Sequence, residues 1–272
     1  MSRQSGVASF LASAALTAIL AGSLGGCQSM SDITGSVTAK SEAPPAPDAN
    51  PQRASEYYGE RYRTNPKDVD AALAYGQALR ANGQRTQAVA VLEQACIANP
   101  GNNALLAGWG RALADNGNFQ QAFDVLTKAH SPENPDWRIL SVQGTVLDQL
   151  GRHDEARSYY TNALKIVPGE PSVLSNLGMS YMLTKDLPKA EEALRQAMAN
   201  PKAGSKVRQN LGLVVGLQGR FAEAEQIVKA DLPPDEAAAN VAYLREMLKG
   251  NKDNSRPTGR GARNVPIAEL AR

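Results

Sequence analysis

The chain contains 272 residues, and its 29 basic side chains are nearly balanced by 27 acidic ones, which leaves a formal net charge of +2 at pH 7. This balance argues against a nucleic-acid partner, because proteins that bind nucleic acids carry a clear excess of Lys and Arg. Two histidines and two cysteines supply few ligands, so we expect neither a metal site nor a cofactor.

The first 26 residues have the composition of a secretory signal peptide. Arg3 gives a positive start, and the uncharged apolar run from Val7 to Leu20 is too short for a comfortable membrane span. The run ends in Leu24-Gly25-Gly26-Cys27, which resembles the signal of bacterial lipoproteins. This resemblance implies cleavage before Cys27 and acylation of that cysteine. The alternatives are an ordinary signal peptide with an incidental cysteine and a plain anchor helix.

Residues 27–50 contain a proline-rich run, Pro44-Pro45-Ala46-Pro47, and no helical periodicity. We interpret them as the lipidated cysteine followed by a disordered tether, because prolines favour an extended chain. Gln28 follows the cysteine. In lipoproteins an aspartate at that place tends to retain the protein in the inner membrane, so the resemblance implies an anchor at the periplasmic face of the outer membrane of a Gram-negative bacterium.

A glycine then returns every 34 residues, and an alanine follows twelve residues after each glycine. A period of 34 is typical of arrays of helix-turn-helix units. The glycines are Gly76, Gly110, Gly144, Gly178 and Gly212, and the alanines are Ala88, Ala122, Ala156, Ala190 and Ala224.

Larger residues keep the same period, three residues after each glycine and four residues after each alanine. These spacings place them on one face of a helix. We expect each glycine to lie where the two helices of its unit cross, so that a larger residue there would overpack the contact and cost about 1–3 kcal/mol. The two sets are Leu79, Leu113, Leu147, Tyr181 and Val215, and Leu92, Leu126, Tyr160, Leu194 and Val228.

A second glycine marks the turn between the two helices of most units. Glycine readily adopts the left-handed conformation that ends a helix. In the fourth unit Lys185 replaces this glycine, and Pro188 follows in the first turn of the next helix. The turn glycines are Gly83, Gly117, Gly151 and Gly219.

The fourth unit, VLSNLGMSYMLTKDLPKAEEALRQAMANP, resembles the tetratricopeptide repeat. The resemblance implies an all-α, right-handed superhelical solenoid of about five helix-turn-helix units over residues 51–249. A lone second helix near 52–64 and a closing helix near 235–249 would cap its ends. Residues 250–272 form an arginine-rich stretch, which we interpret as a disordered basic tail. Contact of this tail with anionic lipid or a partner is the alternative.

We find no combination of residues with catalytic spacing, and we expect that the protein is not an enzyme and has no small-molecule substrate. His153 occupies a slot that Phe119 and Phe221 fill in other units, so we interpret it as a packing residue. Cys96 falls at an offset that packs inward. An enzyme with an unfamiliar site is the remaining alternative.

The geometry of the tetratricopeptide repeat family places the first helix of each unit on an inner, ligand-facing surface. The early units are polar at these positions and the last two are apolar, which suits an amphipathic partner helix. Alternatively, the apolar groups pack under neighbouring helices. Asn176 and Lys206 also match two of the five positions of a carboxylate clamp found in the family, too few to predict one. The expected groove residues are Arg111, Arg138, Thr145, Asn176, Met179, Met182, Leu183, Lys206, Leu213 and Leu217.

The predicted mature chain is similar to TadD-type lipoproteins of Tad (Flp) pilus systems. The similarity includes GCQSM, NPKDVDAALAYGQALR and QGRFAEAEQIVKADLPP. It implies a pilotin-like scaffold that helps an outer-membrane secretin, or another component of pilus assembly, to localise or assemble. An outer-membrane adaptor for cell-wall hydrolases or synthases is the alternative function.

Overall fold

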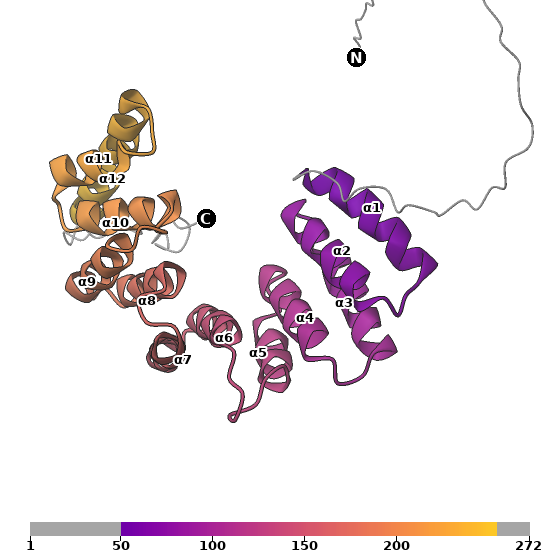
Figure 1. Ribbon diagram of the computed structural model, residues 1–272. Coiled ribbons are helices and arrows are strands. Elements are labelled where there is room, and N and C mark those ends of the chain that lie inside the picture. Colours follow the sequence, from indigo (N-terminus) through magenta and orange to yellow (C-terminus); the bar gives the residue numbers. More distant parts are fainter. Residues whose placement is uncertain (1–49, 255–272) are drawn as a thin grey trace, which may run out of the picture. The chain divides into compact units, whose positions relative to one another are not determined.

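A computed structural model describes residues 50–254, so the predicted signal peptide, Cys27 and almost all of the predicted tether lie outside the described residues, as does the predicted tail beyond residue 254. The described part contains twelve α-helices and no β-strand (Figure 1). None of these helices is long and apolar enough to span a membrane. They are α1 (Pro51–Thr64), α2 (Val69–Ala81), α3 (Arg85–Ala98), α4 (Asn103–Asp115), α5 (Phe119–Lys128), α6 (Trp137–Gln149), α7 (His153–Ile166), α8 (Pro171–Leu183), α9 (Leu187–Met198), α10 (Ser205–Leu217), α11 (Phe221–Val228) and α12 (Pro234–Asn254).

Five helical hairpins, from α2–α3 to α10–α11, correspond to the five repeat units, which confirms the predicted all-α solenoid. The single helix α1 packs on α2, and α12 packs on α10 and α11 at the other end. The helix α12 continues past the expected end near residue 249, to Asn254. Its sequence offers a physical reason, because no proline interrupts it between Pro234 and Pro257.

The five periodic glycines lie where the two helices of each hairpin cross, as the sequence predicts. A Cβ atom at Gly76 would lie 2.6 Å from Leu92 Cδ1, and one at Gly144 would lie 2.5 Å from Tyr160 Cε1. Gly110, Gly178 and Gly212 face Leu126, Leu194 and Val228 in the same way. The absence of a side chain therefore lets the two backbones of each hairpin approach closely.

Left-handed residues end the first helix of every hairpin. Gly83 has a φ of 73°, and its turn is closed by a hydrogen bond from the backbone N–H of Gln84 to the carbonyl oxygen of Leu79. Lys185 takes the same conformation, with a φ of 63°, and is the only non-glycine residue in the described part with a positive φ. A side chain in this region is strained, because its Cβ crowds the backbone.

Successive hairpins contact each other mainly through the second helix of one hairpin and the first helix of the next, so that α3 packs on α4, α5 on α6, α7 on α8 and α9 on α10. Neighbouring first helices also contact each other, α2 with α4, α4 with α6, α6 with α8 and α8 with α10. The surface that the first helices α2, α4, α6, α8 and α10 share is called the first-helix face below. Polar side chains link neighbouring first helices across it, as in the pair of Asn176 Nδ2 and Ser141 Oγ at 3.2 Å.

Candidate functional site

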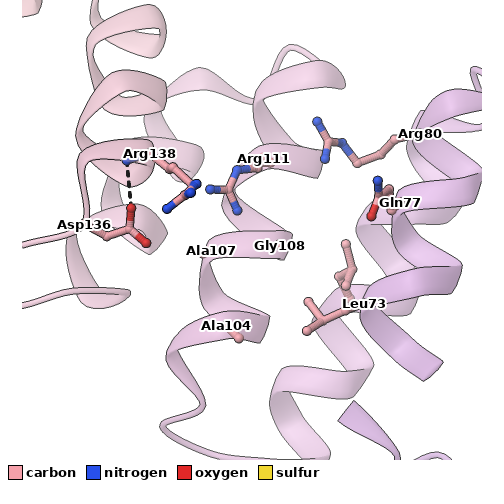
Figure 2. Close-up of a pocket in the computed structure, with 10 residues that line it drawn as sticks. Leu73, Gln77, Arg80, Ala104, Ala107, Gly108, Arg111, Asp136 and Arg138 are labelled. Carbon is pink, nitrogen blue, oxygen red and sulfur yellow. Dashed lines mark hydrogen bonds between the residues drawn. The ribbon is translucent and has the colours of Figure 1, made fainter. Parts of the chain in front are cut away.

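A pocket of about 700 Å³ opens on the first-helix face, between α2, α4 and α6 (Figure 2). Its size falls in the range of about 300–1,000 Å³ that is usual for ligand pockets. Three arginines and one carboxylate are the charged groups among its lining residues. The lining residues are Leu73, Gln77, Arg80, Leu92, Ala104, Ala107, Gly108, Arg111, Asp136 and Arg138.

The three arginines come from three neighbouring first helices. Arg80 lies in the last turn of α2, Arg111 lies on α4, and Arg138 is the second residue of α6. Asp136 caps α6 and accepts a hydrogen bond from the backbone N–H of Arg138 at 2.7 Å, which fixes the start of that helix. Figure 2 shows Arg80 and Arg138 extending toward Arg111 from opposite sides.

The three guanidinium groups differ in their partners. Arg80 donates from Nε to Asp115 Oδ2 at 2.6 Å, and the guanidinium carbon of Arg138 lies 4.5 Å from the centre of the Trp137 ring. The half-buried Arg111 makes no hydrogen bond or ion pair within residues 50–254. Burial, together with repulsion from Arg80 and Arg138, lowers the pKa of Arg111 below its ordinary value, and the nearby Asp136 carboxylate opposes this shift only in part.

The remaining lining residues give the pocket an apolar side. Ala104, Ala107 and Gly108 form one wall on α4, and Leu73 of α2 lies opposite (Figure 2). A Cβ atom at Gly108 would lie 2.9 Å from Leu73 Cδ2, so the absence of a side chain at Gly108 leaves space between α4 and Leu73. The pocket thus combines an uncompensated positive charge with a surface of small apolar groups.

The structure places Arg111 and Arg138, two of the expected groove residues, together in this pocket. Thr145 is exposed on α6, and its hydroxyl donates to the carbonyl oxygen of Ser141. Asn176 donates to the Ser141 hydroxyl from the neighbouring helix. Lys206 is exposed near the start of α10. These residues therefore lie along the first-helix face without forming a single pocket with Arg111.

The expected apolar groove in the last two hairpins needs a correction at Met182. This residue is only 3% exposed and belongs to the hydrophobic core, because its repeat position packs beneath the next hairpin. Met179, Leu213 and Leu217 are half-buried and pack against the same core, and Leu183 is half-buried as well. Most of the apolar surface predicted for a partner is therefore used in packing between hairpins.

Leu213 also lines a smaller pocket of about 350 Å³ between α10 and the closing helix α12. Tyr243 of α12 borders this pocket and is 63% exposed. The charged groups that distinguish the pocket between α2, α4 and α6 are missing from its lining residues. We therefore regard the arginine-lined pocket as the candidate site.

A buried polar cluster beside the first-helix face was not predicted. Asp148 is 8% exposed and accepts hydrogen bonds from Ser180 Oγ at 2.8 Å and from Tyr160 Oη at 3.0 Å, while His153 Nδ1 lies 2.9 Å from its carboxylate. A signal was present in the sequence, since Tyr160 stands where three other units have leucine. The cluster joins the third and fourth hairpins, and its satisfied partners indicate a structural role.

Family models match three segments of the chain, each of which overlaps the next. Residues 107–171 and 149–211 match models described as tetratricopeptide repeat, and residues 48–129 match a model described as anaphase-promoting complex, cyclosome, subunit 3. None of the curated proteins compared with the chain matches it.

Two solved structures share the fold at low sequence identity. The crystal structure of the APC/C hetero-tetramer Cut9–Hcn1 superposes with a TM-score of 0.60 at 16% identity, covering 73% of this chain and 40% of that chain. A structure from the functional characterization of Pseudomonas aeruginosa pilF gives a TM-score of 0.53 at 16% identity, covering 66% of this chain and 90% of that chain. The periodic glycine crossings, the five hairpins and the family matches agree, and the described part of the chain is therefore a solenoid of the tetratricopeptide-repeat fold.

Proposed function

We propose that the protein is a non-enzymatic scaffold that captures a segment of a partner protein on the first-helix face. The observation that carries this proposal is the open pocket between α2, α4 and α6, which holds a half-buried arginine, Arg111, that makes no ion pair within the described residues. An uncompensated buried charge costs stability, so its presence in an open pocket favours a ligand role.

The partner we propose is the outer-membrane secretin, or another component, of a Tad (Flp) pilus or related secretion apparatus. The support is the similarity of the sequence to TadD-type lipoproteins, including GCQSM around Cys27. Acylation of Cys27 would anchor the scaffold at the periplasmic face of the outer membrane. Anchoring both partners at one membrane raises their effective concentration without any new contact.

Secretin multimers in isolated cell envelopes test this function. We expect the multimers and pilus export to be lost when the protein is absent, and also when Arg111→Glu reverses the charge at the centre of the pocket. Arg85→Glu is the matched control, because Arg85 is exposed on α3 and does not line the pocket. Unchanged multimers and export in cells that lack the protein would refute the pilotin-like role. Co-purification with cell-wall hydrolases or synthases, with a defect in septation, would instead favour the adaptor function.

A further inference from the structure

We infer that the pocket between α2, α4 and α6 recognises an acidic peptide segment, in which the carboxylate of an internal Asp or Glu binds Arg111 and an adjacent apolar side chain contacts Leu73 and Ala104. This inference rests on the proposed function, since it specifies the chemistry of the captured segment. Its starting observation is the unequal pairing of the three arginines.

The three arginines of the pocket are unequally paired, since within the described part of the chain Arg80 alone among them makes an ion pair and the Arg138 guanidinium lies against the Trp137 ring. Asp115 neutralises Arg80 at 2.6 Å, and the Asp136 carboxylate is engaged by the backbone of Arg138. Arg111 lies between Arg80 and Arg138 and is repelled by both, while the Asp136 carboxylate attracts it without forming an ion pair. An incoming carboxylate would therefore relieve this repulsion and supply the missing acceptor for the Arg111 guanidinium.

The shape of a guanidinium favours a carboxylate in this place. Its N–H groups form a planar fork that can bind both oxygens of a carboxylate through parallel hydrogen bonds. Arg138 extends from the opposite side of the pocket and is exposed, so it can contact the same anion (Figure 2). One carboxylate can thus be held between two helices, α4 and α6, that belong to different hairpins.

The apolar wall indicates a peptide in preference to a free inorganic anion. Ala104, Ala107 and Gly108 present small groups over which an extended backbone can lie closely, and Leu73 offers an apolar contact beside them. A volume of about 700 Å³ leaves room for several residues. Charge and apolar surface lie next to each other, as an acidic segment with an apolar neighbour requires.

The test is fluorescence anisotropy with the full chain and a labelled peptide probe, acetyl-Gly-Leu-Glu-Glu-Leu-Gly-amide. We expect this peptide to bind at least tenfold more tightly than its Gln-Gln counterpart, and we expect high salt to weaken its binding. Arg111→Met, which removes the charge but keeps an unbranched stem, should weaken binding of the Glu-Glu peptide at least tenfold. Arg85→Met removes the same charge from an exposed position on α3 and should change the affinity less than twofold.

Four results would overturn the inference: equal binding of the two peptides, full affinity in Arg111→Met, no binding by either peptide, or tight binding only by a Gln-Gln peptide with a free C-terminal carboxylate. Inorganic phosphate and chloride are compared as competitors of the labelled peptide at equal ionic strength. If phosphate displaces the peptide more strongly than chloride does, the pocket is a phosphate site and the inference is wrong. Thermal unfolding monitors the fold, and Arg111→Met should melt no lower than the wild type because it removes an uncompensated charge. If the peptide tests fail while secretin assembly still depends on the protein, the inference about acidic peptides is wrong and the proposed function still holds.

Discussion

Substitution of Gly144 by alanine tests the physical basis of the repeat. The new methyl group would lie 2.5 Å from Tyr160 Cε1, closer than carbon atoms approach in a packed core. Tyr160 is 1% exposed, and its hydroxyl donates to the buried Asp148 at 3.0 Å, so the ring cannot move away freely. The substitution therefore forces a collision at a place where the surroundings are fixed.

The magnitude follows from three opposing effects. Replacing glycine by alanine within a helix contributes about 1 kcal/mol of stability. Overpacking costs about 1–3 kcal/mol, and a weakened hydrogen bond to the buried Asp148 carboxylate costs about 1.5–3 kcal/mol. We expect Gly144→Ala to lower the free energy of unfolding by about 3 kcal/mol, measured by urea unfolding followed by far-UV circular dichroism.

Two comparisons isolate the cause. Gly250→Ala places its methyl group in α12 with no atom within 4 Å, so this control should be neutral or slightly stabilising. In a Tyr160→Ala background the collision is absent, and Gly144→Ala should then lose its penalty. A stabilised Gly144→Ala variant, or an equal penalty in both backgrounds, would refute the argument that close helix crossing requires this glycine.

Three further outcomes are expected. Lys185→Gly should raise the free energy of unfolding by about 1 kcal/mol, because it relieves a side chain held at a φ of 63°; a lower urea midpoint would contradict this. Hydrogen bonds to Glu191 from Arg220, and then from Gln218 and Arg195, lower the pKa of Glu191 from 4.5 to about 2. Its contribution is therefore complete above pH 4.5 and disappears as the pH falls toward 2, so the stability difference between the wild type and Glu191→Gln should shrink over that range. Burial raises the pKa of Cys96 to about 11, so iodoacetamide should alkylate this thiol at least tenfold more slowly in the folded than in the urea-unfolded protein.

The repeat architecture was predictable because each hairpin repeats the same local requirement. A close crossing needs a glycine, and a left-handed turn favours one, so Gly76 and Gly83 carry both signals in the sequence itself. The exception at Lys185 was visible as a break in the pattern, and the structure shows that the backbone keeps the left-handed turn at this residue.

The candidate site was predictable only in part. The repeat phase placed Arg111 and Arg138 on the first-helix face, but it could not tell which arginine has a counterion. Asp115 pairs with Arg80 of the preceding hairpin and leaves Arg111 alone, which depends on how two hairpins pack. The burial of the Met182 side chain depends on the same packing, because the position of the next hairpin decides whether a side chain on the edge of a first helix is covered.

Each periodic glycine and the large residue that it faces belong to a single hairpin, and the separation along the chain is the same in all five, as in Gly76 with Leu92 and Gly212 with Val228. Genetic duplication or deletion of one unit, with its ends in the connecting loops, would therefore carry both halves of the steric match together. The pairing of Arg80 with Asp115 bridges two units and would be separated by insertion of a copy between them. Changes in array length can thus preserve the hairpins while altering ligand preference at the new junction.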